Sequence, residues 1–81
     1  MNIIVYYKIG CPWAEEVMEF LDEHNLPFEE RNIGVNEDFR LKLLEKTGQT
    51  SSPTVEIDGE IIADTDAEAV ADYLETHGVR S

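Results

Sequence analysis

Residues 3–14 read IIVYYKIGCPWA, and this stretch leads from a strand into a helix through a single cysteine. Residues 3–7 are β-branched or aromatic and are apolar on both faces, which is typical of a strand buried in the middle of a sheet. Gly10 breaks this run. Pro12 suits the first turn of a helix, where its missing N–H has no partner to lose. Beyond it, apolar residues recur at the spacing of one helix face: Ala14, Val17, Met18 and Leu21. The pattern predicts an amphipathic helix of about four turns.

A second strand and a second helix are predicted next. Residues 28–33 are strand-like. Asn36 is a good N-cap for the helix that follows, and Gly48 ends that helix. Its buried side is expected to consist of Phe39, Leu43 and Leu44, with Leu41 beside them.

The C-terminal part of the chain predicts a hairpin and a third helix. The Asp58-Gly59 pair separates two β-rich runs, 54–57 and 60–63, and marks a two-residue turn because both turn residues must tolerate a positive φ. Residues 64–66 are capping residues that start a helix expected to run up to Gly78. The apolar side of this helix is expected to be Ala67, Val70, Ala71 and Leu74.

The predicted order is therefore strand, helix, strand, helix, hairpin, helix, in one α/β domain over residues 1–81. We expect the first strand–helix–strand unit to make a right-handed parallel crossover and the hairpin to add antiparallel strands to the same sheet. Helices then cover both faces of a four-stranded mixed sheet.

Composition excludes several classes of function. The 81 residues include six Lys and Arg against 18 Asp and Glu, for a net charge of -12, which argues against nucleic-acid binding. The acids spread from Glu15 to Glu75, so we interpret them as a solvated surface. One cysteine excludes an internal disulfide framework and a zinc site of several thiolates. No apolar run approaches the roughly 20 residues of a membrane span, and no basic leader precedes the first strand, so we expect a cytoplasmic protein with a reduced thiol.

Cys11 is the candidate nucleophile. At the start of a helix it lies near free N–H groups and the positive end of the helix dipole, and Lys8 adds a cation nearby. Both favour the thiolate, which is the reactive form, whereas Glu15 and Glu16 oppose it. Two other interpretations are a buried, inert cysteine and an exposed thiol without turnover. We favour reactive chemistry.

Four motifs in order along the chain carry a resemblance to a known family. They are the strand before the Cys-Pro-aromatic motif at 11–13, the Thr47-Gly48 helix end, Ser51-Ser52-Pro53, and the hairpin at 55–59. Together they resemble the glutaredoxin family of thiol–disulfide oxidoreductases over essentially the whole chain, although that family usually has Thr-Val-Pro at positions 51–53. The resemblance implies a thioredoxin-like three-layer α/β/α sandwich with the order βαβαββα.

The resemblance also implies residue roles around the nucleophile Cys11. Lys8 and Arg40 would each meet a carboxylate of glutathione. Pro53 would be a cis-proline facing Cys11, and the backbone of Ser52 would pair with the glutathione peptide.

Four further positions would complete the site. Pro12 and Trp13 would flank the thiol, with Trp13 in place of the usual Tyr; a partly buried helix residue is the other interpretation of Trp13. Thr65 and Asp66 would supply the helix N-terminus that holds the γ-glutamyl carboxylate, with Asp66 available for the ammonium group.

Two positions depart from the family pattern. Ala14 replaces the second cysteine of Cys-x-x-Cys, so no internal disulfide can form and the mechanism must be monothiol. Asp64 replaces a glycine and brings a negative charge near an anionic ligand, which disfavours glutathione if the carboxylate faces the site. If Asp64 is instead a helix cap, it points away. Another small thiol or a protein thiol is then an alternative to glutathione.

We therefore expect a monomeric monothiol oxidoreductase that reduces glutathione mixed disulfides, with glutathione as co-substrate, no permanently bound cofactor and no metal. Its partners would be glutathionylated or disulfide-containing proteins. Two alternatives stay open. One is a [2Fe-2S] cluster carrier acting as a glutathione-dependent dimer, although that branch usually carries Cys-Gly-Phe-Ser and an insertion. The other is a redox-inactive binding module of the same fold.

Overall fold

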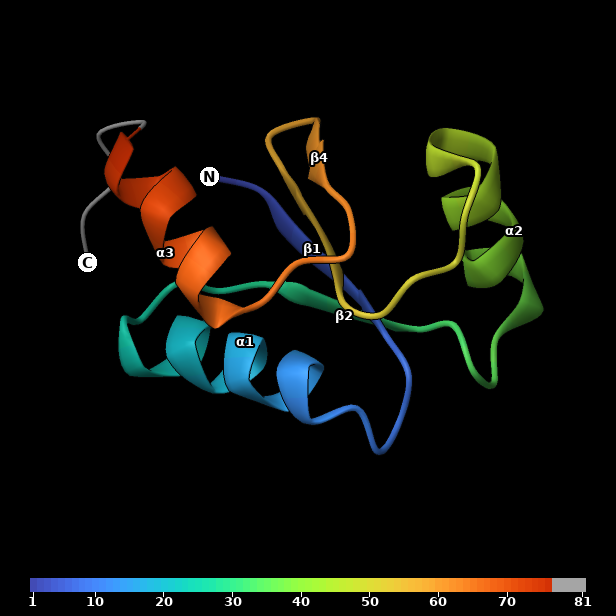
Figure 1. The fold of residues 1–81 in the computed structure, drawn as a ribbon, viewed down its shortest axis with the longest axis horizontal. Coiled ribbons are helices and arrows are strands. Elements are labelled where there is room, and N and C mark those ends of the chain that lie inside the picture. Colours follow the sequence, from blue (N-terminus) through green and yellow to red (C-terminus); the bar gives the residue numbers. More distant parts are fainter. Residues whose placement is uncertain (77–81) are drawn as a thin grey trace.

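A four-stranded mixed sheet forms the middle layer of the computed structural model, which describes residues 1–76. The strands are β1 (Ile3–Tyr7), β2 (Glu29–Asn32), β3 (Thr54–Ile57) and β4 (Glu60–Ile62), in the spatial order β2-β1-β3-β4. β1 pairs in parallel with β2 and antiparallel with β3, and β3 pairs antiparallel with β4 (Figure 1). The predicted order and mixed sheet are confirmed. The predicted helix end at Gly78 lies outside the described residues.

Three helices complete the sandwich: α1 (Pro12–Glu23), α2 (Glu37–Thr47) and α3 (Ala67–Thr76). The larger core lies between the sheet and the α1–α3 pair, and consists of Ile3, Val5, Val17, Leu21, Val55, Ile57, Val70 and Leu74. The smaller core lies under α2 and consists of Ile4, Tyr6, Ile33 and Leu43, with Phe39 packed against it. Alternate residues of β1 thus serve opposite layers, as the period of two in a strand requires.

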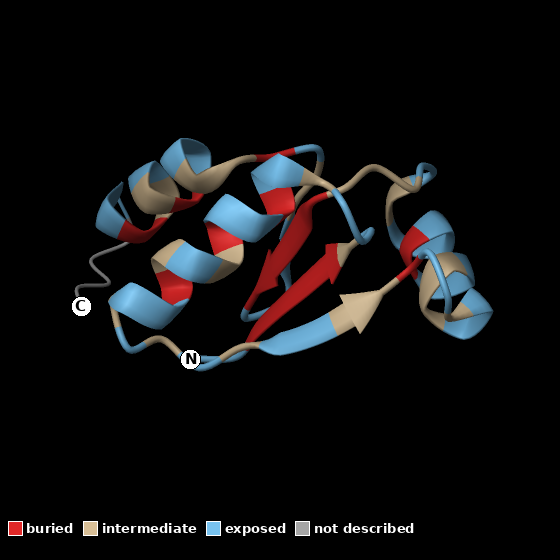
Figure 2. Cartoon of the chain, turned by 90° about the horizontal axis from the view of Figure 1, so that it is seen from below, coloured by how far each residue is buried: buried red, intermediate tan, exposed pale blue. Residues whose placement is uncertain are grey.

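The two central strands are buried, and the edge strands are not. Figure 2 shows β1 and β3 as the buried middle of the sheet, with β2 more exposed at one edge. This pattern agrees with the apolar β1 run and with the charged sequence of β2. None of the three helices, as far as the structure describes them, has the length and apolar character needed to cross a bilayer.

Local signals fix the element ends as predicted. The Asn36 side chain accepts a hydrogen bond from the Phe39 N–H at 3.1 Å and so caps α2. Gly48 ends the same helix at a φ of 77°, in the left-handed region that glycine adopts without strain. Asp58 and Gly59 both have positive φ, at 49° and 91°, as the two-residue hairpin turn requires.

The predicted burial of Leu44 is wrong, because its side chain is 40% exposed. α2 meets the sheet through a narrow stripe, in which Leu43 is fully buried and Phe39 partly. Leu44 is the next residue after Leu43, so it lies about 100° around the helix, away from the sheet.

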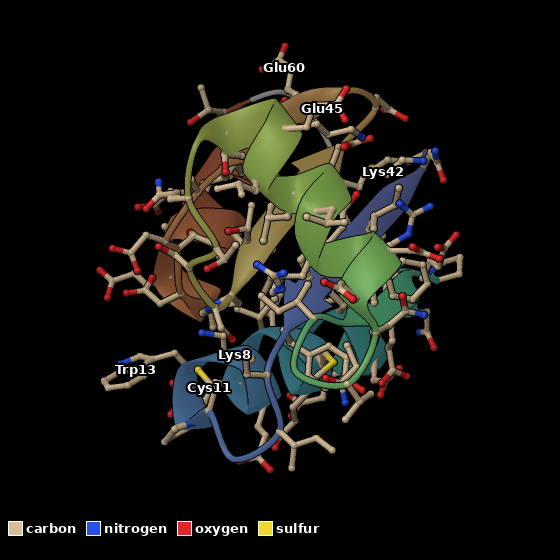
Figure 3. The ribbon with its side chains drawn as sticks, turned by 90° about the vertical axis from the view of Figure 1, so that its right-hand side faces the viewer. Lys8, Cys11, Trp13, Lys42, Glu45 and Glu60 are labelled. Carbon is tan, nitrogen blue, oxygen red and sulfur yellow. The ribbon has the colours of Figure 1, made fainter. Side chains whose placement is uncertain are left out.

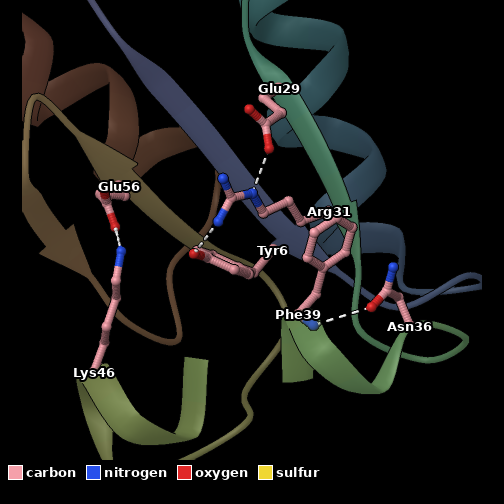
Figure 4. Close-up of polar contacts among 7 residues, drawn as sticks. All are labelled: Tyr6, Glu29, Arg31, Asn36, Phe39, Lys46 and Glu56. Atoms are coloured by element: carbon pink, nitrogen blue, oxygen red, sulfur yellow. Dashed lines mark hydrogen bonds and ion pairs between the residues drawn. The ribbon is translucent and has the colours of Figure 1, made fainter. Parts of the chain in front are cut away.

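Polar and cation–π contacts also hold α2 against the strands (Figure 4). Lys46 pairs with Glu56 of β3 at 2.7 Å, and this hydrogen bond raises the pKa of Lys46 above its usual value. Arg31 of β2 pairs with Glu29 and donates to the Tyr6 hydroxyl at 2.9 Å, and the bond to Glu29 raises the pKa of Arg31. The Arg31 guanidinium also lies 5.3 Å from the Phe39 ring centroid. These contacts tie α2 to the strands around its small core.

Candidate active site

Cys11 is the N-cap residue of α1, with an extended backbone (φ -89°, ψ 107°). Its carbonyl accepts the first helical hydrogen bond from the Glu15 N–H at 3.1 Å, and its thiol is half-buried. Pro12 takes the first helical position, as predicted. The sulfur is therefore reachable and lies beside the unpaired N–H groups of the first turn, where an anion is favoured.

The loop before β3 faces the sulfur. The Ser52-Pro53 peptide bond is cis, as the family resemblance implied. The Cys11 thiol donates to the Ser52 carbonyl at 3.5 Å. Cys11 thus lies directly against the bend at residues 52–53, and the interpretation of Cys11 as a buried, inert core residue does not hold.

The Ser52 hydroxyl makes a contact that the sequence analysis missed. It accepts a hydrogen bond from the Lys8 N–H at 3.0 Å, and the Lys8 carbonyl accepts one from the Cys11 N–H at 3.3 Å. The sequence analysis assigned Ser52 only a backbone role. The sequence did offer a signal for this contact, because Ser52 carries a hydroxyl group where the family that this chain resembles usually has Val.

A pocket of about 240 Å³ is lined in part by Ser52, the residue whose carbonyl accepts from the Cys11 thiol. Its walls are formed by Trp13, Ser52, Asp64, Thr65 and Asp66. The Pro53 carbonyl accepts from the Thr65 N–H at 3.0 Å, which joins the loop before α3 to the cis-proline loop.

The two acids of the pocket differ in role. Asp66 caps α3, because its Oδ1 accepts from the Ala69 N–H at 2.8 Å. Asp64 is exposed, has a left-handed φ of 51° and lines the pocket. Because Asp66 is the cap of α3, Asp64 is not needed for that role. The geometry therefore favours the interpretation in which Asp64 borders the site.

Trp13 and the predicted cations take different positions. Trp13 is 58% exposed and forms a wall of the pocket, so it is not the partly buried helix residue of the alternative interpretation. Figure 3 shows Lys8, Cys11 and Trp13 at the lower left of the view, around the start of α1. The Lys8 side chain is exposed but does not line the pocket. Arg40 lies on α2, pairs with Glu37 at 3.4 Å and does not line the pocket either.

The arrangement can perform nucleophilic chemistry at sulfur. A partly exposed cysteine lies at a helix N-terminus, and two of its neighbours, Trp13 and Ser52, line a small polar pocket. Within residues 1–76, no group of three or more His, Cys, Asp or Glu side chains is placed to hold a metal ion.

Known proteins resemble this chain in sequence. The family model described as Glutaredoxin matches residues 3–62. The chain is 39% identical over 57 residues to the N-acetyl-S-hydroxy-L-cysteine reductase of Bacillus subtilis, a match that covers 70% of this chain and 61% of that relative. The chain thus matches somewhat less than two thirds of the length of this curated relative.

Solved structures resemble it in fold. The crystal structure of the thioredoxin-like protein BC3987 superimposes with a TM-score of 0.79 at 36% identity, covering 86% of this chain and 96% of that one. An epsilon-class glutathione S-transferase from the housefly, Musca domestica, superimposes with a TM-score of 0.68 at 30% identity, covering 93% of this chain and 34% of that one.

Proposed function

We propose that this chain, which belongs to the glutaredoxin family, is a monothiol thiol–disulfide oxidoreductase that reduces glutathione mixed disulfides through Cys11. The observation that carries the proposal is the position of the sulfur. It is half-buried at the N-terminus of α1 and lies 3.5 Å from the carbonyl that precedes the cis-proline. An oxidoreductase function is supported by the family and by the reductase of Bacillus subtilis.

The reaction proceeds in two exchanges. The Cys11 thiolate attacks the glutathione sulfur of a mixed disulfide; the S–S bond breaks, and the partner thiolate leaves and takes up a proton. A second glutathione thiolate then attacks the glutathione sulfur bound to Cys11. This step releases the Cys11 thiolate and glutathione disulfide. Because Cys11 is the only cysteine of the chain, the second thiol must come from outside.

The start of α1 suits the second exchange. The unpaired N–H groups of its first turn would stabilise negative charge on the Cys11 sulfur as that sulfur leaves. The Ser52 carbonyl accepts from the neutral thiol, so this contact is given up when Cys11 reacts.

Glutathione is the proposed co-substrate. Lys8 and Arg40 would meet its carboxylates, and the backbone of Ser52 beside Pro53 would pair with its peptide. Pro12 and Trp13 would flank the bound sulfur, and Thr65 and Asp66 would receive the γ-glutamyl end. The likeness to a glutathione S-transferase over 93% of this chain supports glutathione as the thiol. We propose that the protein acts as a cytoplasmic monomer on glutathionylated or disulfide-containing proteins, without a permanently bound cofactor.

A second candidate function is reduction of a small sulfenic acid. The name of the Bacillus subtilis relative, N-acetyl-S-hydroxy-L-cysteine reductase, favours it. Here the Cys11 thiolate attacks the sulfur of R–SOH and hydroxide leaves as water after protonation, which gives the same kind of mixed disulfide on Cys11. An external thiol completes the cycle as before.

Steady-state turnover tests the proposal. We expect the wild type to deglutathionylate a peptide in the presence of glutathione, and Cys11→Ser to lose at least a hundredfold in rate while keeping its circular dichroism spectrum. Equal rates for the two proteins would refute it. Faster consumption of N-acetyl-S-hydroxycysteine than of the glutathionylated peptide would replace the first function by the second.

A further inference from the structure

We propose that the exposed apolar residues on both sides of Cys11 receive the protein half of a mixed disulfide, and that they select cysteines flanked by apolar and basic side chains. The inference rests on the proposed function, because it concerns the thiol that leaves in the first exchange. It makes Ile9 a specificity-determining residue. The glutathione half keeps the place that the proposed function gives it.

Ile9 lies at the tip of a tight turn that ends at Cys11. The Lys8 carbonyl accepts a hydrogen bond from the Cys11 N–H at 3.3 Å, which closes a four-residue β-turn. Gly10 takes the third position of this turn with a φ of 86°, a left-handed value that glycine adopts without strain. Because two residues span at most about 7 Å, the turn holds Ile9 next to the nucleophile.

The apolar surface on both sides of the thiol is open to solvent. Ile9 is 77% exposed, and Trp13, two residues beyond Cys11, is 58% exposed. The labelled Trp13 side chain projects away from the ribbon beside Cys11 (Figure 3). The space at Gly10 is also open, because among the described residues only its chain neighbours would approach within 4 Å of a Cβ atom placed there. Exposed apolar side chains around a reactive group are typical of a contact site for another protein.

The leaving half of the disulfide comes within reach of these side chains. In the first exchange, the Cys11 sulfur bonds to the glutathione sulfur as the bond from that sulfur to the partner cysteine breaks. The partner thiolate leaves and takes up a proton, so this step consumes no external oxidant or reductant. Each S–S bond is about 2 Å long, so the sulfurs of the two cysteines lie on the order of 4 Å apart during the exchange. A side chain next to the partner cysteine can therefore pack on Ile9 or Trp13.

The charge around the thiol indicates which protein segments fit. Glu15 and Glu16 lie near the start of α1, both are exposed, and neither belongs to an ion pair among residues 1–76. Glu16 follows Trp13 by three residues, so the two side chains are neighbours on the helix surface. The first 30 residues contain one Lys and no Arg, and the proposed function assigns that Lys8 to glutathione. A partner with Lys or Arg near its reactive cysteine is therefore complementary to this side of the site.

Both contacts have an expected size. Covering about half of an isoleucine side chain that is otherwise in water corresponds to about three- to tenfold in rate. One pair of opposite charges roughly 8 Å apart in water corresponds to about twofold at low ionic strength. Salt screens the charge contact but not the apolar one, so the two can be measured separately.

The test uses three glutathionylated peptides that differ only beside the cysteine. Their sequences are Lys-Leu-Cys-Leu-Lys, Lys-Ser-Cys-Ser-Lys and Glu-Leu-Cys-Leu-Glu. Because all three carry the same glutathione half, the binding of that half cancels when their rates are compared. Reduced protein is mixed with each peptide below saturation. Transfer of the glutathionyl group to Cys11 and release of the peptide thiol are followed by mass spectrometry.

Variants of Ile9 remove the intrinsic reactivity of each peptide from the comparison. We expect Ile9→Ser to lower the ratio of the Lys-Leu peptide rate to the Lys-Ser peptide rate about three- to tenfold, and to leave the Lys-Ser peptide rate itself unchanged. Ile9→Leu keeps an apolar side chain and should keep the ratio. The matched control is Ile61→Ser, the same substitution on the edge strand β4, which β3 separates from β1. It should leave the ratio unchanged.

The charge contact has its own variant. The wild type should react faster with the Lys-Leu peptide than with the Glu-Leu peptide at low salt, and this preference should shrink in about 1 M sodium chloride. Glu16→Gln should lower the low-salt preference about twofold. Glu23→Gln at the end of α1, about 10 Å further along the helix, should leave it unchanged.

The outcomes separate the inference from the proposed function. Equal peptide ratios in the wild type and Ile9→Ser would overturn the inference, and so would a preference for the basic peptide that Glu16→Gln leaves unchanged. Equal rates for all three peptides, with Cys11→Ser inert, would also overturn it but leave the proposed function standing. Failure of the wild type to take the glutathionyl group from any peptide would overturn both.

Discussion

Ser52 links the two loops of the site, the one before α1 and the one before β3, by hydrogen bonds. Its hydroxyl accepts from the Lys8 N–H at 3.0 Å, and its carbonyl accepts from the Cys11 thiol at 3.5 Å. One residue thus fixes both ends of the turn that presents the sulfur. A hydrophobic residue at this position would keep the carbonyl contact but leave the Lys8 N–H without its partner.

Replacement of Ser52 should therefore slow the reaction of Cys11. We expect Ser52→Ala to lower the rate of mixed-disulfide formation severalfold and the free energy of unfolding by about 1 kcal/mol, because a hydrogen bond is lost. Ser52→Thr keeps the hydroxyl and should restore both. The matched control is Ser51→Ala, since among the described residues the Ser51 hydroxyl bonds only the exposed Gln49 side chain. Stopped-flow rates and urea unfolding check this, and a wild-type rate in Ser52→Ala would rule out a positioning role.

At the level of single residues, the sequence predicted which residues form the site better than it predicted the contacts that they make. Cys11 at a helix start followed from a short motif, whereas a cis peptide at Pro53 was implied by the family resemblance; both are present. The hydroxyl contact of Ser52 and the pocket position of Asp64 depend on how three loops meet. No local pattern encodes that meeting. The predicted carboxylate contacts of Lys8 and Arg40 stay predictions.

Of the three helices, as far as the structure describes them, α2 has the fewest fully buried residues. A polar contact helps to hold it against the sheet. Leu43 is its only fully buried residue, and Lys46 reaches across to Glu56 on β3. Glu56 is 9% exposed, so its carboxylate depends on this partner. The ion pair thus holds the C-terminal half of α2 against the sheet.

Loss of Lys46 should destabilise the protein more than its partly exposed position suggests. We expect Lys46→Met to lower the free energy of unfolding by about 1–3 kcal/mol, because Glu56 is left buried without a cation. Adding Glu56→Gln should recover part of this loss. Lys42→Met on the same helix serves as the matched control and should stay within about 0.5 kcal/mol of the wild type. If Lys46→Met matched Lys42→Met in urea unfolding, the pair would have no stabilising role.

The same pair predicts a pH dependence. The bond to Glu56 raises the folded-state pKa of Lys46 above its ordinary value of 10.5. A raised lysine pKa stabilises the fold below the unfolded-state pKa, and this contribution is lost as pH rises through the folded-state pKa. The stability difference between wild type and Lys46→Met should therefore be constant below about pH 10 and shrink in more alkaline solution. A difference that grew with alkaline pH would contradict this assignment.

Element types and ends could be predicted because their signals are local. Asn36, Gly48 and the Asp58-Gly59 turn each act within a few residues of themselves. The burial of Leu44 was predicted wrongly, since an apolar residue at a helix edge has no local signal for which way it faces. The Lys46–Glu56 pair was not predicted, because it depends on the register of α2 over the sheet.

Over the whole molecule, charge is segregated by layer. The described parts of α1 and α3 carry acids and no Lys or Arg: Glu15, Glu16, Glu19, Asp22, Glu23, Glu68, Asp72 and Glu75. The described basic residues lie on α2, on β2 and just after β1: Lys8, Arg31, Arg40, Lys42 and Lys46. With a net charge of -12 over 81 residues, repulsion within the α1–α3 layer opposes the compact state.

Salt should therefore stabilise this protein. Raising sodium chloride from about 0.01 M to 1 M shortens the Debye length from ~30 Å to ~3 Å and screens the acidic layer. We expect Tm to rise over this range, and Glu19→Gln to show a smaller rise than the wild type because it removes one of the repelling charges. Calorimetric melting in graded salt checks both. A Tm that fell with salt would mean that attractive pairs, such as Lys46–Glu56, outweigh the repulsion.

The most direct test of the account is the fate of Cys11 in a single turnover. Reduced protein is mixed with a glutathionylated peptide in the absence of any second thiol, and both products are weighed by mass spectrometry. The account predicts that one glutathionyl group moves to Cys11 and that one equivalent of free peptide thiol appears. An unchanged protein mass, with the peptide still glutathionylated, would contradict it.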